Sequence, residues 1–168
     1  MKSSSIPLQA KPQPRISVFI TSYNQKAYLR EAIDSVLAQT LSPYEIIVVD
    51  DASTDGSQDL IQDYASQHPD LIKTIFHQTN TGVTQSRVDA LEAVTGDYVT
   101  YVDGDDRFLP TKLEKEYAAL RQAPEARIAF SNNYYMTAEG IRTGMWIEDD
   151  KPPQGKVFVQ TFGRLYPK

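Results

Sequence analysis

Three carboxylates occur within four consecutive residues of the chain, in the segment Asp103-Gly104-Asp105-Asp106. Carboxylates held this close repel one another, and a bound divalent cation relieves that repulsion most simply. The chain has no cysteine and only two histidines, so a metal would be held by oxygen atoms, which favours magnesium or manganese. The alternative is a solvated acidic turn, in which Asp and Gly only suit the local backbone. We favour the metal site, because the cluster directly follows a predicted buried strand.

Two other polar groups follow predicted strands: Thr21-Ser22-Tyr23-Asn24 comes after the first, and Asp50-Asp51 comes after the second. Neighbouring side chains on a strand point to opposite faces, so we expect at most one of Asp50 and Asp51 to face a ligand and the other to cap the following loop. Arg87, near the start of a predicted helix, could bind a phosphate or a base, or could be an ordinary surface residue. Tyr23 could equally be a packing residue.

Short apolar runs alternate with helical periodicity from Arg15 onward, which is typical of βαβ units and a parallel sheet. The predicted strands span residues 16–20, 45–49, 71–76, 98–102 and 127–130. Amphipathic helices separate them, and the helix after Gly82 is expected to point Val88, Leu91 and Val94 inward. A weaker signal pairs residues 134–136 with 144–147 as a hairpin. Open parallel sheets bind ligands at the carboxyl ends of their strands, so the polar groups should meet in one crevice.

The bulk composition fits one globular domain and excludes some classes of function. A chain of 168 residues with 40% hydrophobic content can bury one core, and its net charge of -5 argues against a nucleic-acid partner. Residues 1–14 are rich in Ser, Pro, Lys and Gln and are expected to form a flexible lead-in to a domain over residues 15–168. No run approaches the roughly 18 apolar residues of a membrane span, which favours the cytoplasm and leaves peripheral association with the inner face of the membrane open.

Four segments together resemble the family 2 glycosyltransferases, which have the GT-A fold. They are residues 16–24, 35–40, 48–57 and 101–106; they occur in the family's order and, with the intervening chain, cover about residues 15 to 130. Each segment alone would be a weak signal, whereas the combination is specific. The resemblance implies an α/β fold with a mostly parallel, Rossmann-like central sheet flanked by helices, and an incomplete acceptor-binding half.

The resemblance also implies how the nucleotide would be held. Thr21 and Tyr23 would hold the base, with Tyr23 stacked on it, and Asp51 would accept a hydrogen bond from the imide N–H of uracil. Asn80-Thr81-Gly82 and the following Arg87 resemble the donor-loop segment of the family. Arg87 would therefore lie near the nucleotide.

The acidic cluster matches the DXD element of this family. Asp103 would approach the ribose, Asp105 would bind the metal that bridges the diphosphate, and Asp106 would contact the substrate or support its neighbours. The implied cofactor is Mn2+ or Mg2+, and the implied donor is a nucleotide sugar, expected to be a UDP-sugar. The implied reaction is an inverting transfer, in which a carboxylate deprotonates a hydroxyl of a saccharide or other acceptor and the oxygen attacks the anomeric carbon.

The sequence offers only weak candidates for that catalytic base. The family carries it on a segment after the fifth strand and before an amphipathic helix, whereas Asp149 and Asp150 come early and lack such a helix. The chain is also shorter than the catalytic domains of the family, so we expect a chain truncated at its carboxyl end or a naturally short relative. One alternative function is therefore a catalytically incomplete module that binds nucleotide sugars.

A second alternative is a sugar-phosphate nucleotidyltransferase, which also combines an α/β nucleotide fold with a metal. Such an enzyme needs a Gly-rich loop and a basic residue after the first strand, where this chain has Thr21-Ser22-Tyr23-Asn24-Gln25-Lys26. The sequence therefore favours the glycosyltransferase.

Overall fold

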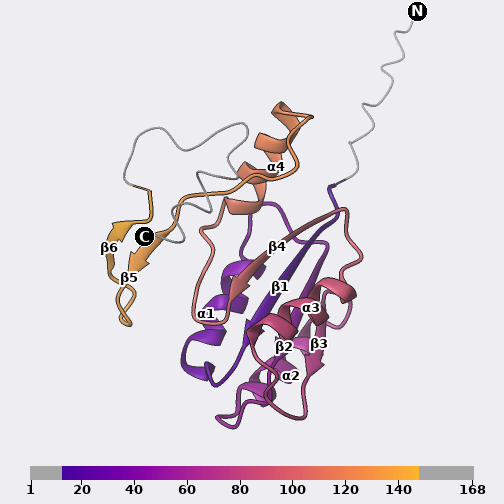
Figure 1. Ribbon diagram of the computed structural model, residues 1–168, viewed down its shortest axis with the longest axis vertical. Coiled ribbons are helices and arrows are strands. Elements are labelled where there is room, and N and C mark those ends of the chain that lie inside the picture. Colours follow the sequence, from indigo (N-terminus) through magenta and orange to yellow (C-terminus); the bar gives the residue numbers. More distant parts are fainter. Residues whose placement is uncertain (1–12, 148–168) are drawn as a thin grey trace, which may run out of the picture. The chain divides into compact units, whose positions relative to one another are not determined.

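The computed structural model describes residues 13–147. Two compact units divide the chain, one over Met1–Glu114 and one over Lys115–Lys168. The first unit contains a parallel sheet in the order β3-β2-β1-β4 (Figure 1). Its strands are β1 (Ile16–Ser22), β2 (Glu45–Asp50), β3 (Ile72–Phe76) and β4 (Tyr98–Asp103). The first four predicted strands are therefore confirmed, with ends that differ by one or two residues.

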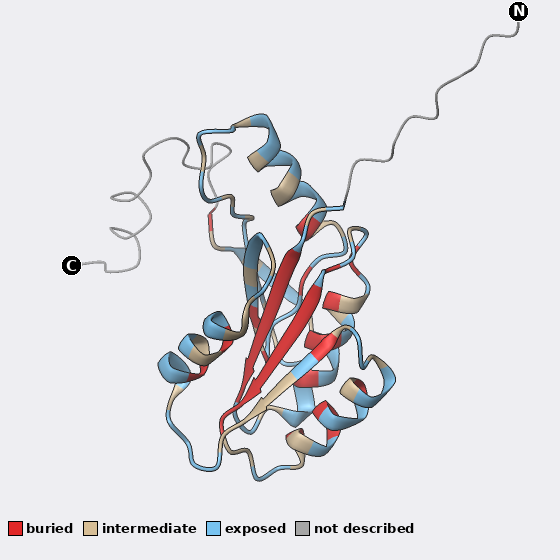
Figure 2. Cartoon of the chain, turned by 90° about the vertical axis from the view of Figure 1, so that its right-hand side faces the viewer, coloured by how far each residue is buried: buried red, intermediate tan, exposed pale blue. Residues whose placement is uncertain are grey.

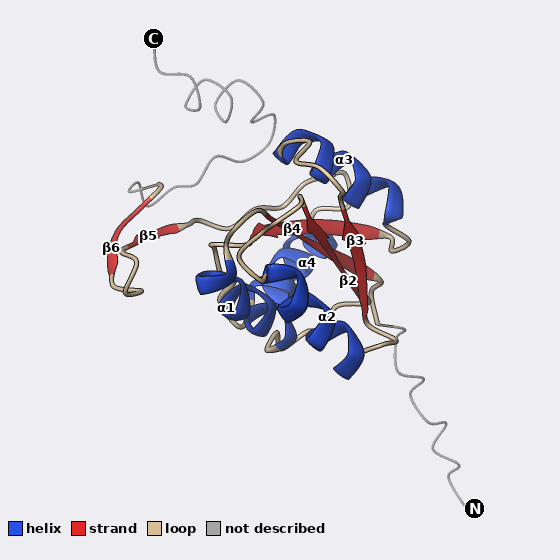
Figure 3. Ribbon diagram, turned by 90° about the horizontal axis from the view of Figure 1, so that it is seen from below, coloured by secondary structure: helices blue, strands red, loops and turns tan. Residues whose placement is uncertain are grey.

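Helices cover both faces of this sheet. α1 (Lys26–Leu37) and α2 (Ser57–Gln67) pack on one face, and α3 (Val83–Ala93) packs on the other (Figure 3). α4 (Lys112–Gln122) begins in the first unit, where its Leu113 is buried, and continues into the second. In the part of the chain that the structure describes, no helix is long and apolar enough to cross a membrane.

β1 and β2 form the centre of the core, because both are buried along their whole length (Figure 2). Side chains alternate between the faces of a strand, so Phe19, Ile47 and Val49 point towards α3 and pack with Ala90. The intervening residues point towards the face that α1 and α2 cover. Near-continuous β-branched runs suit strands covered on both sides, and burying each such side chain contributes roughly 1.5–3 kcal/mol.

α3 buries a different face from the one predicted. Val88 and Leu91 were expected to point inward, but they are 41% and 50% exposed, whereas Ser86 and Ala90 are buried. A helix that lies close to the bulky side chains of a sheet does so through its small residues, and a pattern of large apolar residues does not reveal them. Val94 is partly buried as predicted, although it lies just after the end of the helix.

The predicted burial of β4 and the predicted fifth strand were both wrong. β4 was expected to be buried, but it lies at the edge of the described sheet, and only its Val102 is buried. Residues 127–130 were expected to form a fifth strand, but they form no regular element, and Ile128 is 80% exposed. A short alternating run becomes a strand only where a partner satisfies its backbone groups, and within residues 13–147 no strand pairs with this run.

The hairpin prediction is confirmed in the second unit. β5 (Tyr134–Met136) pairs antiparallel with β6 (Arg142–Met145), so the second strand begins two residues earlier than expected. The pairing is irregular between Tyr135 and Met136.

Glu45 fastens the amino-terminal end of the sheet in the first unit. It is 3% exposed, and its carboxylate accepts hydrogen bonds from the Ser17 hydroxyl (2.6 Å), the Lys73 ammonium (2.6 Å) and the Thr95 backbone N–H (2.6 Å). These partners lie on β1, on β3 and just before β4, so one side chain connects all four strands. Burial alone would raise the pKa of Glu45, but the hydrogen bonds outweigh it and lower the pKa to about 2.

We expect Glu45→Gln to lower the free energy of unfolding near neutral pH by about 1–3 kcal/mol, because a neutral amide cannot replace all of these contacts. A carboxylate with a lowered folded-state pKa stabilises fully above its unfolded-state pKa near 4.5, and this contribution is lost as the pH falls towards about 2. The difference between wild type and variant should therefore shrink in acid. Urea unfolding at neutral pH and at about pH 3 measures both effects.

Glu92→Gln is the matched control, because Glu92 is an exposed residue of α3. We expect it to change the free energy of unfolding by less than about 0.5 kcal/mol. Equal effects of the two substitutions would contradict the anchoring role of Glu45.

Candidate functional site

The carboxyl ends of three strands bring polar residues together, as the sequence predicts. In the parallel register, Thr21 of β1 lies opposite Val49 of β2 and opposite Asp103 of β4. The Thr21 hydroxyl donates a hydrogen bond to Asp103 Oδ1 (3.0 Å), and the N–H of Asp51 donates to the carbonyl of Ser22 (2.9 Å). Segments far apart in the sequence therefore meet at one edge of the sheet.

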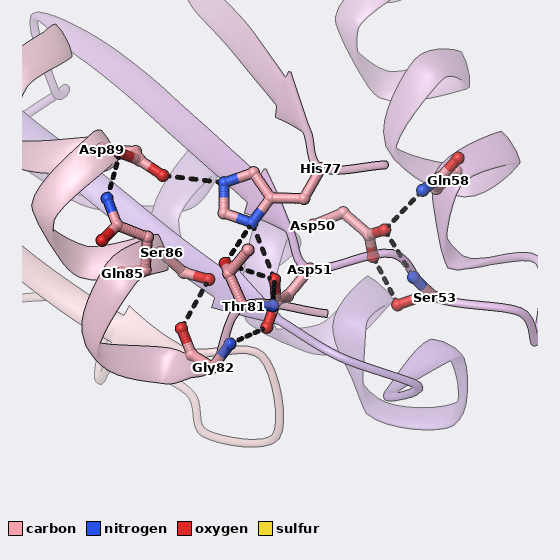
Figure 4. Close-up of polar contacts among 10 residues, drawn as sticks. All are labelled: Asp50, Asp51, Ser53, Gln58, His77, Thr81, Gly82, Gln85, Ser86 and Asp89. Carbon is pink, nitrogen blue, oxygen red and sulfur yellow. Dashed lines mark hydrogen bonds and ion pairs between the residues drawn. The ribbon is translucent and has the colours of Figure 1, made fainter. Parts of the chain in front are cut away.

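The neighbouring carboxylates Asp50 and Asp51 have separate partners, as opposite orientations on a strand predict (Figure 4). Asp50 is fully buried and accepts hydrogen bonds from the N–H (2.9 Å) and hydroxyl (2.5 Å) of Ser53 and from the Gln58 amide (2.8 Å). It thus holds the loop that leads into α2. This leaves Asp51 as the carboxylate of the pair that faces the other strand ends.

Asp51 holds the segment that precedes α3. It is 3% exposed, and its Oδ1 accepts hydrogen bonds from the N–H (2.8 Å) and hydroxyl (2.9 Å) of Thr81, while its Oδ2 accepts one from the Gly82 N–H (2.7 Å). Burial alone would raise the pKa of Asp51, but the hydrogen bonds from Thr81, His77 and Gly82 outweigh it and lower the pKa to about 2. Asp51 is therefore ionised at neutral pH.

His77 is a site residue that the sequence analysis missed. It directly follows β3, its Nδ1 lies 2.7 Å from Asp51 Oδ1, and its Nε2 lies 2.8 Å from Asp89 Oδ2 on α3 (Figure 4). The contact with Asp51 raises the pKa of His77; burial acts in the opposite direction, and Asp89 adds to the increase. Its position directly after a strand could have revealed His77 in the sequence, because the other site residues also lie at or just after strand ends.

Arg87 and Asp103 form an ion pair beside an aromatic ring. The Arg87 Nη2 lies 2.9 and 3.0 Å from the two carboxylate oxygens of Asp103, and the guanidinium carbon lies 4.9 Å from the centre of the Tyr101 ring. Tyr101 in turn stacks on Phe19. Asp103 raises the pKa of Arg87, and the Arg87 Nε is buried without a hydrogen-bond partner. The sequence placed both residues near a ligand, and the structure brings them together.

The acidic cluster does not form a three-carboxylate metal site by itself. Among residues 13–147, no group of three or more acidic or histidine side chains is placed to hold a metal ion. Asp103 turns to Arg87 and Thr21, whereas Asp105 and Asp106 are exposed, so the three carboxylates do not converge on one point. Although Asp106 as a residue is exposed, partial burial of its carboxyl group raises its pKa, and the charges of Asp105 and Asp103 add to the effect.

Gly104 leaves little room where the cluster turns. A Cβ atom there would lie 2.6 Å from Gln25 Oε1, at the end of a flexible side chain, and 3.1 Å from the Thr21 carbonyl oxygen, so a side chain would need Gln25 to move and the end of β1 to shift slightly. Two non-glycine residues just after strands have a left-handed backbone: Asn24 (φ 53°) after β1 and Ala52 (φ 64°) after β2. The Asn24 side chain accepts a hydrogen bond from the Thr54 N–H (2.8 Å), which fastens the loops after β1 and β2 together.

The remaining predicted residues differ in their accessibility. Thr21 is buried, whereas Tyr23 is 48% exposed. The hydroxyl of Ser22 between them is buried without a hydrogen-bond partner. The candidate bases Asp149 and Asp150 lie outside the described residues.

Comparison with known proteins agrees with this arrangement. The family profile described as "Glycosyl transferase family 2" matches residues 17–158. The putative glycosyltransferase EpsE of Bacillus subtilis is 36% identical over 129 residues, which are 77% of this chain and 46% of EpsE. The chain thus spans less than half the length of this relative.

Two solved structures are also similar to this chain. The structure of S. aureus TarS 1-349 in complex with UDP has a TM-score of 0.58 and 29% identity, over 64% of this chain and 32% of that one. The mannosyltransferase PcManGT from Pyrobaculum calidifontis, in complex with GDP-Man and Mn2+, has a TM-score of 0.53 and 28% identity, over 61% of this chain and 32% of that one. With its parallel sheet, its helices on both faces and the family match over most of its length, this chain belongs to glycosyl transferase family 2 and has the GT-A fold.

Proposed function

We propose that this chain binds the nucleotide part of a UDP-sugar and forms the donor half of a glycosyltransferase. The observation that carries the proposal is the strand register, which brings Thr21, Asp51 and Asp103 to one edge of the sheet. Family membership supports it, as does the likeness to TarS, whose structure contains UDP. The expected reaction is an inverting transfer of the sugar to a hydroxyl group of an acceptor.

The base would lie between Tyr23 and Asp51. The exposed ring of Tyr23 offers a flat face for stacking, next to the buried Thr21. Among residues 13–147, Asp51 Oδ2 accepts a hydrogen bond only from Gly82, so one of its lone pairs is available to the imide N–H of uracil. Cytosine carries no proton at that ring nitrogen, so this arrangement favours uridine over cytidine nucleotides.

The ribose and the diphosphate would follow along the edge towards β4. The Asp103 carboxylate, oriented by Arg87 and Thr21, can accept hydrogen bonds from ribose hydroxyls. Arg87 makes both contacts to Asp103 through Nη2, and its Nε is buried. Among residues 13–147 no hydrogen bond engages Nη1, which can donate to the nucleotide.

The residues present fit a divalent cation, Mn2+ or Mg2+. Mg2+ in nucleotide enzymes is commonly held by one or two carboxylates together with substrate phosphates, so Asp105 can serve without a three-carboxylate cluster. Within residues 13–147, no hydrogen bond or ion pair engages Asp105, and its charge contributes to the raised pKa of Asp106. A cation bound there would neutralise charge on the leaving diphosphate. The likeness to PcManGT, whose structure contains Mn2+, supports this assignment.

A nucleotide-sugar-binding module without its own catalysis remains the second candidate. The chain covers 46% of EpsE and 32% of TarS 1-349, so these likenesses support nucleotide binding more directly than they support the activity of a whole relative. A transfer assay with a labelled UDP-sugar distinguishes the glycosyltransferase from the non-catalytic module, since only an active enzyme transfers the labelled sugar. Family membership argues against the nucleotidyltransferase alternative.

We expect UDP to stabilise the chain against thermal unfolding more strongly with manganese than without it. A ligand at about a hundred times its dissociation constant stabilises the folded state by about 2.7 kcal/mol. Asp105→Asn should remove the part of the stabilisation that depends on manganese, because the variant lacks the proposed metal ligand. Thermal unfolding with UDP, with and without manganese, measures the effect.

Asp97→Asn is the control for this substitution, because Asp97 is an exposed residue beside the amino-terminal end of β4, opposite the site. It should keep the full manganese dependence. If Asp105→Asn keeps it too, Asp105 is not the metal ligand. If the wild type shows no dependence, the metal assignment as a whole is wrong.

We expect Tyr23→Ala to weaken UDP binding by roughly tenfold or more, because stacking of a base on an aromatic side chain contributes about 1–3 kcal/mol. Tyr23→Phe keeps the ring and should bind nearly as well as the wild type. Calorimetric titration with UDP measures both affinities. Since Tyr23 is exposed, neither substitution should alter the stability of the free chain by more than about 0.5 kcal/mol.

Tyr28→Ala is the matched control, because this tyrosine is also exposed (41%) but lies on α1. It should leave the affinity for UDP unchanged. Equal losses in Tyr23→Phe and Tyr23→Ala would refute the stacking role.

A further inference from the structure

His77 lies between two carboxylates that come from different elements. Asp51 follows β2 and Asp89 lies on α3, and the imidazole ring spans the gap between them (Figure 4). The two contacts measure 2.7 Å at Nδ1 and 2.8 Å at Nε2, and the side chain of His77 is 10% exposed. The ring is therefore held from both sides and is largely shielded from water.

This geometry favours a doubly protonated ring, because each ring nitrogen lies within 2.8 Å of a carboxylate oxygen. An ionised carboxylate only accepts hydrogen bonds, and a neutral imidazole carries a single N–H, so it could donate to only one of the two acids. The other nitrogen would then turn a lone pair towards a negative charge. The imidazolium form donates to Asp51 and carries its charge against Asp89, with which Nε2 makes an ion pair at 2.8 Å without a well-aligned hydrogen bond. The raised pKa of His77 agrees with this state.

The surroundings of the ring contain few other polar groups. The Thr81 hydroxyl lies 2.9 Å from Nδ1, and Gln85 donates a hydrogen bond to the far oxygen of Asp89 (2.8 Å). Of the neighbouring charged residues, Arg87 turns to Asp103, and Asp50 turns to Ser53. Among the described residues, the charges that act on His77 are thus those of Asp51 and Asp89.

We propose that the imidazolium form of His77 is a positioning residue for nucleotide recognition: supported by Asp89, it holds the Asp51 carboxylate against Thr81 and Gly82. This inference rests on the proposed function. In that position Asp51 Oδ2 keeps a lone pair for the base, and the first residues of α3 are fixed at the edge of the sheet. Loss of the proton would set a lone pair of Nε2 against Asp89 and push α3 away from β3.

The sign of the pH dependence follows from the raised pKa of His77. A group whose pKa is higher in the folded state stabilises that state fully below its unfolded-state pKa, near 6.5, and this contribution is lost as the pH rises through the folded-state value. Because the protonated ring holds Asp51 in place, the affinity for UDP should fall as the pH rises through the folded-state pKa of His77. Asp89→Asn removes one of the two supporting charges, so it should lower the pH at which His77 loses its proton.

The experiment compares the wild type, Asp89→Asn and Asp63→Asn over a range of pH. Asp63→Asn is the matched control, because it removes the same charge from an exposed position on α2, at the opposite face of the sheet. Nitrogen-15 NMR reports the protonation of both ring nitrogens of His77, and His68→Gln assigns the signals of the chain's two histidines. Calorimetric titration with UDP gives the affinity of each variant at the same pH, so that protonation of the ligand affects all variants equally.

We expect His77 to be doubly protonated at neutral pH in the wild type and in Asp63→Asn. In Asp89→Asn, the loss of the proton and the fall in affinity should shift together to lower pH. At a pH where His77 has lost its proton in Asp89→Asn but not in the wild type, this variant should bind UDP on the order of tenfold more weakly than the wild type. Such a loss is expected when a hydrogen bond to a charged group is weakened.

Three results would overturn the inference. A neutral His77 in the wild type at neutral pH would contradict the imidazolium form. Unchanged UDP affinity through the loss of the His77 proton would refute the positioning role and leave the proposed function intact. Failure of UDP to bind at any pH would refute the proposed function, and this inference with it.

Discussion

The hydrogen bonds of the Asp51 carboxylate are the interaction on which the candidate site depends. They join the end of β2 to the segment before α3, and through His77 they reach the end of β3. Backbone N–H groups at a helix start lack partners within the helix, and a buried carboxylate satisfies them while its charge suits the positive end of the helix dipole. Because Asp51 is buried and ionised, the segment from His77 to Gly82 has a defined place before any ligand binds.

β2 carries a buried acid at its start and another just after its end, and the two have different roles. Glu45 accepts hydrogen bonds from both neighbouring strands and from the segment before β4, which sets the register at the amino-terminal edge. Asp51 sets the positions of loops at the carboxyl-terminal edge. Each acid has a pKa lowered to about 2, because several donors compensate the cost of burying its charge. The register fixed at one end therefore places the site residues at the other.

The sequence predicted the sheet and the meeting of the strand ends, because apolar runs and chain order determine both. It did not predict the buried face of α3, since the contacts there are made by the small residues Ser86 and Ala90. Nor could spacing reveal that Arg87 would pair with Asp103 while Asp105 stays exposed. His77 escaped notice because its importance comes from two acids that only the fold brings to its ring. Local pattern specifies elements, whereas pairing between side chains depends on their packing.

α3 links the two ends of the proposed nucleotide site. Its start is held by Asp51 through Gly82, and Arg87, just over one turn further, orients Asp103 at the end of β4. A helix is stiff over this length, so a displacement of its start also moves the guanidinium. The Asp103 carboxylate depends on that guanidinium for its orientation, and Tyr101 restricts the guanidinium from its ring face. Recognition of the base and of the ribose should therefore be coupled, because both rest on the position of one short helix.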